Sequence, residues 1–366
     1  MRPSLRGVIP ARSLPVYVQE GILDKLPELL KSAQRYHRCE LVTDHNVDAI
    51  LGERLVRCLR RAGWTTHKTV LPAGERIKSE RTIKSLHDAW FDRGVDRYTT
   101  VIALGGGTIG DATGYAAATF MRGVPLWQVP TTIIGQVDSA LGGKVGINHQ
   151  RGKNLIGAFY QPSGVVIDPM ALRTLPPRER RSGLAEVIKY GVIADAALFR
   201  RCEGAVDDWL AGDTSIPTST LLACVRIKLR VVEADEADHG LRHHLNFGHT
   251  LGHAIERWGG YRRYKHGEAV AMGMVAAGWM AHQRRRLTAH DFARLEQVCR
   301  KLYPPRITAP ERLSDISQYL QSDKKRMAGT LRWVLPRGIG RVGIVDDVAS
   351  REINGALRYA LSPERR

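Results

Sequence analysis

The chain has 366 residues, of which 43% are hydrophobic and 25% are charged. These proportions are typical of a folded globular protein and exclude a mainly disordered, collagen-like or disulfide-stapled chain, and the length suggests two domains. Lys and Arg (55) outnumber Asp and Glu (37), which gives a net charge of +18 and favours anionic partners such as nucleic acid, acidic membranes or phosphorylated metabolites. Because the excess is scattered along the chain, an Arg-rich solvated surface is the simpler interpretation.

The five cysteines include no C-x-x-C pair. An odd number of unpaired cysteines indicates reduced thiols, mostly buried, in a cytoplasmic compartment. The N-terminus shows no apolar stretch of the kind that forms a signal peptide. The longest apolar run, residues 269–281, is too short to span a bilayer and predicts a buried helix.

Strand-like and helix-like segments alternate up to about residue 170. The predicted strands are 40–43, 66–71 and 100–104, and the predicted helices are 47–62, 78–93 and 112–120. Such alternation indicates βαβ units and a mainly parallel sheet. From about residue 177 the periodicity becomes helical, notably in 183–234, 249–258 and 266–286. The sequence therefore predicts an α/β domain over 1–175 and a mainly helical domain over 176–366, with a break at Pro176-Pro177.

A glycine turn follows the strand predicted at 100–104. Gly105, Gly107 and Gly110 fit the pattern G-x-G-x-x-G. Glycine lets the backbone approach a phosphate, and a following helix offers free N–H groups to it. No Lys-Ser/Thr pair follows, which excludes an ATP-type P-loop, and the usual acid about 20 residues further on is missing. A tight strand-to-helix turn is the alternative, but the strand context favours a dinucleotide site, with Asp44 as a candidate for the ribose.

Two donor-rich pieces follow within residues 138–154. The first is Asp138-Ser139-Ala140-Leu141-Gly142-Gly143-Lys144, and the second is Gly152-Lys153-Asn154. Glycines beside lysines and an amide form a loop that suits an anion. Each piece alone is also compatible with a solvated surface loop, but their proximity favours anion binding.

Three histidines lie within residues 249–266. His249 and His253 are spaced i, i+4, so a helix places them on one face, and His266 follows. The spacing alone suggests His249 and His253 as a pair of zinc ligands. Position 250 is Thr, so the protease motif H-E-x-x-H is absent. A metal or acid–base site is favoured over structural histidines, and the spacing leaves open which carboxylate completes it.

Five stretches together resemble the sugar-phosphate cyclase family and, within it, the 3-dehydroquinate synthases. These stretches are 105–123, 130–162, 183–191, 245–256 and 265–273. The resemblance implies a Rossmann-like NAD-binding domain followed by a mainly helical metal- and substrate-binding domain. It also implies one divalent metal, zinc or cobalt, held by Glu186, His249 and His266, which moves His253 from the metal to the substrate site.

The resemblance further implies cofactor and substrate residues. The positions that match NAD contacts are Asp44, Asn46, Glu75, Lys78, Gly105, Gly106, Gly107, Asp111, Thr131, Thr132, Lys144, Lys153 and Thr174. The positions that match the substrate site are Arg122, Asp138, Lys144, Asn154, Lys189, Lys228, Arg242, Asn246 and His253, with one of Lys324 and Lys325. In the family the residue that matches Arg122 reaches across a dimer interface, which implies a homodimer.

The activity implied is conversion of 3-deoxy-D-arabino-heptulosonate 7-phosphate to 3-dehydroquinate and phosphate in the shikimate pathway. The implied steps are transient oxidation by NAD, phosphate elimination, reduction and aldol closure. Three alternatives stay open at this point: a cyclase that makes an aminodehydroquinate, an inosose or a valiolone; a metal-dependent polyol dehydrogenase; and a nucleic-acid-binding protein, for which only the net charge speaks. The expected partner is a small sugar phosphate, with no nucleic acid and no membrane.

Overall fold

The structure is a computed structural model that describes residues 4–9, 12–33, 36–212, 215–236, 240–307, 312–326 and 331–362, without the side chains of residues 5–9, 12, 32–33 and 321–326. Its contacts divide the chain into two compact units, Met1–Leu175 with Ser215–Glu233, and Pro176–Thr214 with Ala234–Arg366. The first division falls at the break predicted beside Pro176. The segment 215–233, which the sequence places in the second domain, belongs to the first unit.

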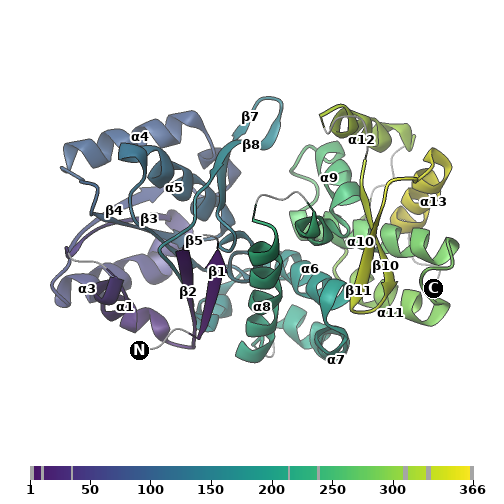
Figure 1. Ribbon diagram of the computed structural model, residues 1–366, viewed down its shortest axis with the longest axis horizontal. Helices are drawn as coiled ribbons and strands as arrows, with labels where there is room; N and C mark the ends of the chain where they lie inside the picture. Colours follow the sequence, from purple (N-terminus) through teal and green to yellow (C-terminus); the bar gives the residue numbers. More distant parts are fainter. Residues whose placement is uncertain are drawn as a thin grey trace. The chain divides into compact units, whose positions relative to one another are not determined.

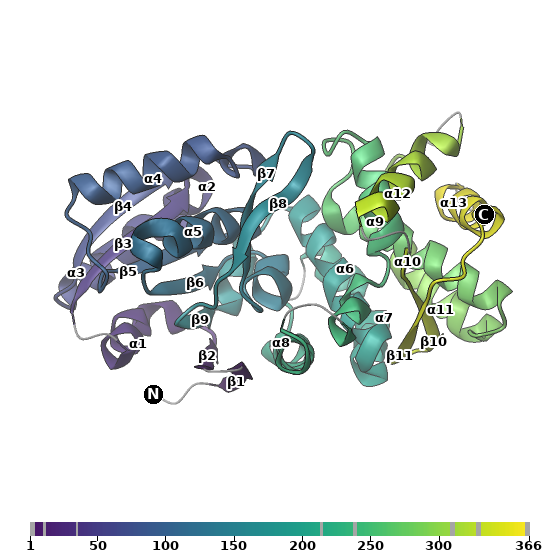
Figure 2. The ribbon, with the colours of Figure 1, turned by 45° about the horizontal axis from the view of Figure 1, so that its top comes forward.

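Seven strands of the first unit form one sheet in the order β1-β2-β9-β6-β5-β3-β4 (Figures 1 and 2, with β6 and β9 labelled in Figure 2). These strands are β1 (Leu5–Ile9), β2 (Arg12–Val18), β3 (Arg38–Asp44), β4 (Thr65–Leu71), β5 (Thr100–Gly105), β6 (Leu126–Pro130) and β9 (Gly164–Ile167). All neighbouring pairs are parallel except β1 and β2. This confirms the predicted Rossmann-like sheet.

Helices cover both faces of the sheet (Figure 2). The helices of this unit are α1 (Leu26–Ala33), α2 (His45–Val47), α3 (Glu53–Arg61), α4 (Glu80–Asp92), α5 (Gly107–Thr119) and α8 (Thr218–Ala234). Ile102 and Leu104 of β5 pack in a cluster with α1 and α3, while Val101 and Ala103 pack with α4 and α5. Successive side chains of a strand point to opposite faces, so a strand buried on both sides reads as one continuous apolar run.

Helix α8 packs on one face of the sheet at β2 and β9, although it follows two helices of the other unit in the chain. Val225, Leu229 and Val232 of α8 pack in a buried cluster with residues of β2 and β9. These contacts explain why residues 215–233 belong to the first unit.

The short turns of the first unit are 3₁₀ or π-helical. They are η1 (Ile22–Lys25), η2 (Asp48–Gly52), η3 (Glu75–Ile77), η4 (Phe120–Arg122), η5 (Gly135–Ser139) and η6 (Pro169–Thr174). The π-helical turn η2 interrupts the single helix predicted over 47–62. Helix α5 begins at Gly107 rather than at residue 112, because the glycine turn itself forms the first helical turn.

The segment predicted as a donor-rich loop contains an antiparallel hairpin, formed by β7 (Lys144–His149) and β8 (Gly152–Phe159). Gly146 lies directly opposite Gly157. A Cβ atom on Gly146 would lie 2.5 Å from the carbonyl oxygen of Ile156, so the backbones approach closely at this pair. Glycines at these positions hide the alternating pattern that identifies a strand in a sequence.

The second unit is mainly helical, as predicted. Its elements are α6 (Pro177–Ala194), α7 (Ala196–Ala211), η7 (Leu241–Asn246), α9 (His249–Trp258), α10 (His266–Gln283), α11 (Ala289–Arg300), α12 (Ser314–Arg326), β10 (Trp333–Gly338), β11 (Arg341–Val345) and α13 (Ser350–Leu361). Helix α10 contacts α6, α9, α11, α13 and β10. It is buried along almost its whole length, which confirms the buried helix predicted at 269–281. The hairpin β10–β11 was not predicted.

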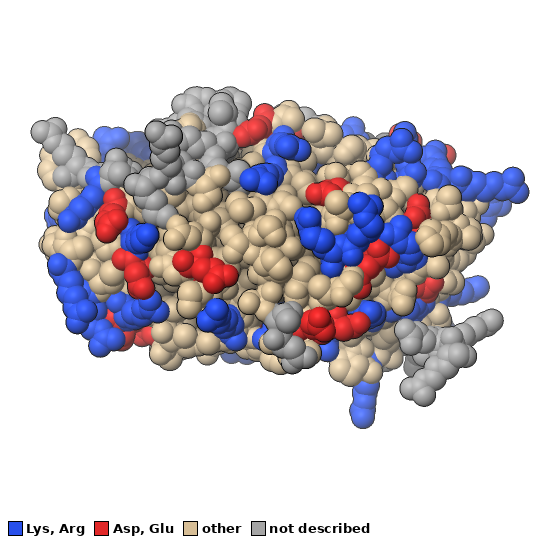
Figure 3. Space-filling model, turned by 90° about the horizontal axis from the view of Figure 1, so that it is seen from below, with Lys and Arg blue, Asp and Glu red and all other residues tan. Residues whose placement is uncertain are grey.

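Three further expectations from the sequence concern the cysteines, membrane-spanning helices and the surface charge. All five cysteines are free, and all but Cys58 are buried, as predicted. In the described part of the chain, no helix combines the length and the apolar character that crossing a membrane requires. On the face shown in Figure 3, basic side chains are interspersed with acidic ones, which fits a solvated charged surface.

Candidate functional site: a metal-ligand cluster and a cofactor cradle

Three side chains of the second unit converge in a group that suits a metal ion. Glu186 comes from the middle of α6, and His249 and His266 are the first residues of α9 and α10. Nε2 of His249 lies 3.4 Å and Nε2 of His266 lies 3.5 Å from the same Oε1 of Glu186. The three ligand atoms therefore lie within reach of a single ion.

The Nδ1 atoms of both histidines are held by hydrogen bonds. Nδ1 of His249 donates to the carbonyl oxygen of Phe247 at 3.0 Å. Nδ1 of His266 donates to the carboxylate of Glu256 at 3.1 Å. In a neutral imidazole, a proton on Nδ1 leaves the lone pair on Nε2, so both rings direct a potential ligand nitrogen toward Glu186.

Glu186 is completely buried, and neither of its oxygens accepts a well-directed hydrogen bond from the described residues. The buried ammonium group of Lys189 forms an ion pair with it. Burial alone raises the pKa of a carboxyl group, but the charge of Lys189, together with His249, holds the pKa of Glu186 well below its usual value. Glu186 is therefore an ionised carboxylate that lacks directed donors, as a metal ligand requires.

His253 lies beside this group without belonging to it. Its ring centre is 5.4 Å from that of His249 and 5.8 Å from that of His266. The side chain of His253 is exposed on one side, but the surrounding protein and then the two neighbouring histidines lower its pKa. In contrast, the neighbouring carboxylates of Glu186 and Glu256 outweigh the effect of burial and raise the pKa of His266 to about 10, so a metal ion that binds Nε2 has to displace its proton. His249 thus converges with Glu186 and His266, and not with His253 as the spacing alone suggests.

Close packing of α6 against α10 brings Glu186 and His266 together. The N–H of Gly267 donates to the hydroxyl of Ser182 at 2.9 Å. A Cβ atom on Gly267 would lie only 1.8 Å from the carbonyl oxygen of Ser182, so no larger residue fits there. Beside this contact, the buried carboxylate of Glu268 accepts two hydrogen bonds, at 3.1 and 3.0 Å, from the guanidinium group of Arg178.

The first unit carries the residues predicted to bind the dinucleotide. Strand β3 lies between β4 and β5, so the chain reverses its direction of strand addition between β3 and β5. Val42 pairs with Ala103, and each strand ends two residues later, at Asp44 and Gly105. In open parallel sheets, ligands bind at the carboxyl ends of the strands at such a switch point.

The glycine turn leaves the start of α5 open to a ligand. Gly106 is the N-cap of α5, and no side chain caps the helix. A Cβ atom on Gly106 would lie 2.9 Å from Cγ2 of Thr132, and one on Gly107 would lie 2.8 Å from Oγ of Ser139. The uncapped N–H groups and the favourable end of the helix dipole therefore suit a phosphate group.

Lys78 connects this cradle with the hairpin β7–β8. Its side chain is 4% exposed, and Nζ lies 2.7 Å from Oδ2 of Asp111. The same ammonium group contacts Oδ1 of Asn154. Burial raises the pKa of Asp111 to about 6 despite the opposing charge of Lys78. The structure thus joins two predicted cofactor residues and one predicted substrate residue in one polar cluster.

The other predicted NAD residues take the following places in the first unit. Asp44 caps α2 by accepting from the N–H groups of Asn46 and Val47 at 2.9 and 3.2 Å. Glu75 belongs to η3, Thr131 and Thr132 follow β6, Lys144 and Lys153 belong to β7 and β8, and Thr174 ends η6.

The predicted substrate residues are divided between the two units. In the first, Lys228 of α8 contacts Asp138 of η5 at 2.6 Å. Arg122 lies in a strained turn, because Met121 (φ 46°) and Arg122 (φ 65°) both adopt the left-handed conformation. In the second unit, Arg242 is buried and donates to the carbonyl oxygen of Glu236 at 2.7 Å. The side chains of Lys324 and Lys325 lie outside the described residues.

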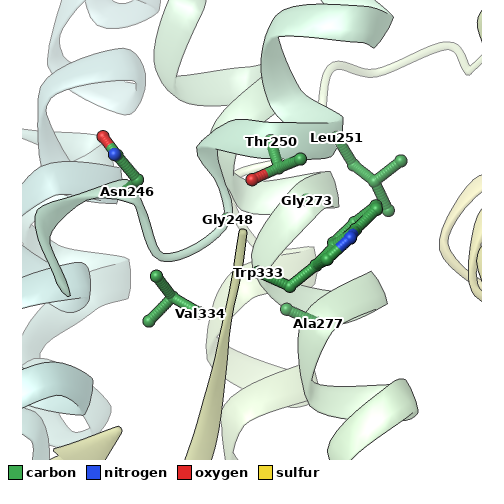
Figure 4. A pocket seen from close by; sticks show the side chains of 8 residues that line it. All are labelled: Asn246, Gly248, Thr250, Leu251, Gly273, Ala277, Trp333 and Val334. Atoms are coloured by element: carbon green, nitrogen blue, oxygen red, sulfur yellow. The ribbon is translucent and has the colours of Figure 1, made fainter. Parts of the chain in front are cut away.

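A small pocket lies beside Asn246 in the second unit (Figure 4). Its lining consists of Asn246, Gly248, Thr250, Leu251, Gly273, Ala277, Trp333 and Val334. None of these side chains is charged, so this pocket does not supply the cationic groups that an anionic substrate needs.

Glu256 is the residue of the metal group that the sequence reasoning missed. It is buried and belongs to a second potential ligand set with His253 and His266. The available signal was its position, since it lies three residues after His253 and seven after His249, on the same face of α9.

Comparisons with known proteins agree over most of the chain. Two family models match, one described as 3-dehydroquinate synthase N-terminal over residues 68–182 and one as 3-dehydroquinate synthase C-terminal over residues 183–326. A 3-dehydroquinate synthase from Desulforamulus reducens is 45% identical over 350 residues, which cover 94% of this chain and 97% of the relative.

Two solved structures resemble the chain over nearly its full length. A 2-epi-5-epi-valiolone synthase from Streptomyces hygroscopicus subsp. jinggangensis, with NAD⁺ and Zn²⁺ bound, has a TM-score of 0.88 and 31% identity, covering 96% of this chain and 98% of its own. A 2-deoxy-scyllo-inosose synthase complexed with carbaglucose-6-phosphate, NAD⁺ and Co²⁺ has a TM-score of 0.86 and 25% identity, covering 97% and 99%.

Proposed function

This chain belongs to the 3-dehydroquinate synthase family, and from that premise we propose that it converts 3-deoxy-D-arabino-heptulosonate 7-phosphate to 3-dehydroquinate and phosphate. The reaction eliminates phosphate and closes a carbocycle, which makes the enzyme a carbon–oxygen lyase of aromatic amino acid biosynthesis. The observation that carries the proposal is the convergence of Glu186, His249 and His266 in a chain that is 45% identical to a relative of that name.

The metal-binding role rests on the donor set. A buried carboxylate without directed donors and two imidazoles whose Nδ1 atoms are already bonded supply three ligands, which suits zinc or cobalt and leaves a position open for substrate oxygen atoms. A divalent ion bound there supplies a Lewis acid for a substrate hydroxyl group. Phe247 and Glu256 orient the two histidines, and Lys189 balances the charge of Glu186.

The dinucleotide-binding role rests on the switch point and the open start of α5. A Cβ atom on Gly106 or Gly107 would collide with Thr132 or Ser139, so glycine keeps the turn tight and leaves its backbone N–H groups uncovered for a pyrophosphate. The second oxygen of Asp44 remains available for a ribose hydroxyl, because only Oδ1 caps α2. NAD held there supplies a hydride acceptor that is regenerated within the catalytic cycle.

The substrate carries a carboxylate and a phosphate, and the chain offers cationic and amide groups for both. We assign Lys228, Arg242 and Asn246 to the carboxylate, since Arg and Lys bind such groups through charge-assisted hydrogen bonds. We assign Arg122, Lys144, Asn154 and His253 to the phosphate. Asp138 holds the ammonium group of Lys228 in place. His253 is neutral at physiological pH, because its pKa is lowered, so it offers a hydrogen bond to the phosphate rather than a positive charge.

We also propose a cytoplasmic homodimer, in which Arg122 serves the partner's site. The turn that carries Arg122 is held in an uncommon left-handed conformation, as expected of a residue with a functional constraint. Sedimentation equilibrium should give twice the monomer mass.

Another cyclase of the same fold is the alternative. The valiolone synthase resembles this chain at 31% identity, against 45% for the dehydroquinate synthase. Arg242 and Lys228 suit a substrate with a carboxylate, which supports the dehydroquinate reaction.

The deciding experiment measures phosphate release from the heptulosonate phosphate with catalytic NAD and zinc, while NADH absorbance is followed in parallel. Phosphate and dehydroquinate in equal amounts, without net NADH, are expected. Activity only on an amino sugar phosphate or another sugar phosphate would assign the chain to a different cyclase. Accumulating NADH would instead indicate a dehydrogenase.

Variants of the metal group test the ligand assignment. Glu186→Gln and His249→Ala should lose bound metal and turnover together, because three ligands do not tolerate the loss of one. His290→Ala, on the exposed surface of α11 in the same unit, is the matched control and should keep both. Full turnover in a Glu186→Gln protein that holds no metal, measured by atomic absorption, would overturn the assignment.

A further inference from the structure

Asn148 lies where the hairpin β7–β8 departs from regular pairing. Ile147 pairs with Ile156 and His149 pairs with Gly152, so one residue of β7 faces three residues of β8. The middle one of these three is Asn154, which adopts the left-handed conformation with φ 55°. Bulges of this kind redirect a side chain, and here the redirected side chain is a proposed substrate ligand.

The side-chain amide of Asn148 bridges the bulge and the cofactor side of the same unit. Its Oδ1 accepts from the N–H of Asn154 at 2.9 Å, and its Nδ2 donates to Oε1 of Glu75 at 2.9 Å. Its backbone N–H donates to the carbonyl oxygen of Lys78 at 3.0 Å. These partners fix the amide orientation, because the N–H group requires an acceptor and the carboxylate requires a donor.

The bridge continues on both sides. Oε2 of Glu75 accepts from the hydroxyl group of Thr108, in the first turn of α5, at 3.4 Å. Lys78 contacts both Asp111 of α5 and the side chain of Asn154. The side chain of Asn154 and its backbone N–H are therefore both tied to residues that flank the dinucleotide cradle.

We infer that Asn148 is a positioning residue that holds Asn154 in its bulged conformation and links it to the cofactor residue Glu75. This inference rests on the proposed function, in which Glu75 serves NAD and Asn154 serves the substrate phosphate. Asn148 itself touches neither ligand in this assignment. Its two amide atoms have separate tasks, since the oxygen serves the substrate side and the nitrogen serves the cofactor side.

Two substitutions separate these tasks. Asn148→Ala removes both bonds and should raise the KM for the heptulosonate phosphate at least about tenfold, because Asn154 loses the partner of its N–H group. Asn148→Asp keeps the acceptor for Asn154 but loses the donor and places a negative charge beside Glu75. It should raise the dissociation constant of NAD, measured by direct titration, more than it raises KM. Gln150→Ala, in the exposed turn of the same hairpin, should change neither constant.

A double-mutant cycle shows whether Asn148 acts through Asn154. In the Asn154→Ala background, adding Asn148→Ala should raise KM less than twofold further, because the positioned group is already gone. Additive effects on KM, wild-type constants in both variants, or losses that only follow the melting temperature would each overturn the inference. No turnover by the unaltered chain would overturn the proposed function, and this inference with it, whereas normal turnover with unaffected variants would overturn the inference alone.

Discussion

At the scale of single residues, the proposed metal group depends on two groups that we do not assign as ligands. Glu256 and the carbonyl oxygen of Phe247 each accept from an Nδ1 atom and so determine which nitrogen the histidine offers. The two acceptors differ in charge. A carboxylate makes its imidazole a stronger donor of electron density than a neutral carbonyl does, so His266 depends on its acceptor more than His249 does.

Glu256→Ala should therefore weaken zinc binding by about 10- to 100-fold, since the ring of His266 loses both its orientation and its negative partner. Glu256→Gln keeps an acceptor without the charge and should fall between Ala and the unaltered protein. Competition titration with a chromophoric chelator measures the affinity directly, and the visible spectrum of the cobalt form reports ligand geometry. Equal affinity in all three proteins would remove Glu256 from the metal group.

At the scale of elements, glycine contacts between helices determine where the ligands meet. His249 and His266 begin their helices, so the crossing of α9 and α10 sets their separation. A Cβ atom on Gly273 of α10 would lie 1.9 Å from the carbonyl oxygen of Gly248, the residue before His249. Gly267 makes the corresponding contact with α6. These glycines are required by close backbone approach rather than by helix propensity, which they lower.

Gly267→Ala should force α6 and α10 apart and separate Glu186 from His266. Overpacking of this kind costs about 1–3 kcal/mol of the free energy of unfolding, and zinc affinity should fall with it. Gly204→Ala, on the exposed side of α7, is the matched control. A Cβ atom there meets nothing within 4 Å, so helix propensity alone should stabilise the protein by up to about 1 kcal/mol. Denaturant unfolding and zinc titration of both variants check this, and wild-type zinc affinity in Gly267→Ala would contradict it.

At the scale of the whole molecule, the two proposed ligands belong to different units. The metal group lies entirely in the second unit, and the glycine turn and its neighbours lie entirely in the first. A ligand that binds only the folded state raises the free energy of unfolding by about 2.7 kcal/mol at 100 times its dissociation constant. Zinc and NAD should therefore each raise the melting temperature independently.

Variants in each of the two units separate the rise in melting temperature caused by zinc from the rise caused by NAD. His266→Ala should abolish the shift caused by zinc and keep the shift caused by NAD. Gly106→Val should do the reverse, because its side chain would occupy the space beside Thr132. Differential scanning calorimetry of each variant, with each ligand alone, measures both shifts. Loss of both shifts in either variant would show that the units do not bind their ligands separately.

The sequence by itself determined the features that arise from local periodicity and local turns. The helices at 249–258 and 266–283, the apolar strand β5 and the glycine turn after it were all predictable. Their hydrogen bonds and apolar spacing repeat within a few residues, so a short window contains the signal. The resemblance to a family added the proposed ligand set, which spacing did not give, since the i, i+4 pattern favoured His253 over His266.

Only the tertiary structure decided which distant residues meet. It brought Glu186, 63 residues before His249 in the chain, against both histidines through helix contacts that only glycine permits. It placed α8 on the sheet of the first unit, formed a hairpin from much of the segment 138–154 that was predicted as a loop, and placed Asn148 between Glu75 and Asn154. These results depend on packing and on hydrogen bonds between segments far apart in the chain, for which no local pattern of residues exists.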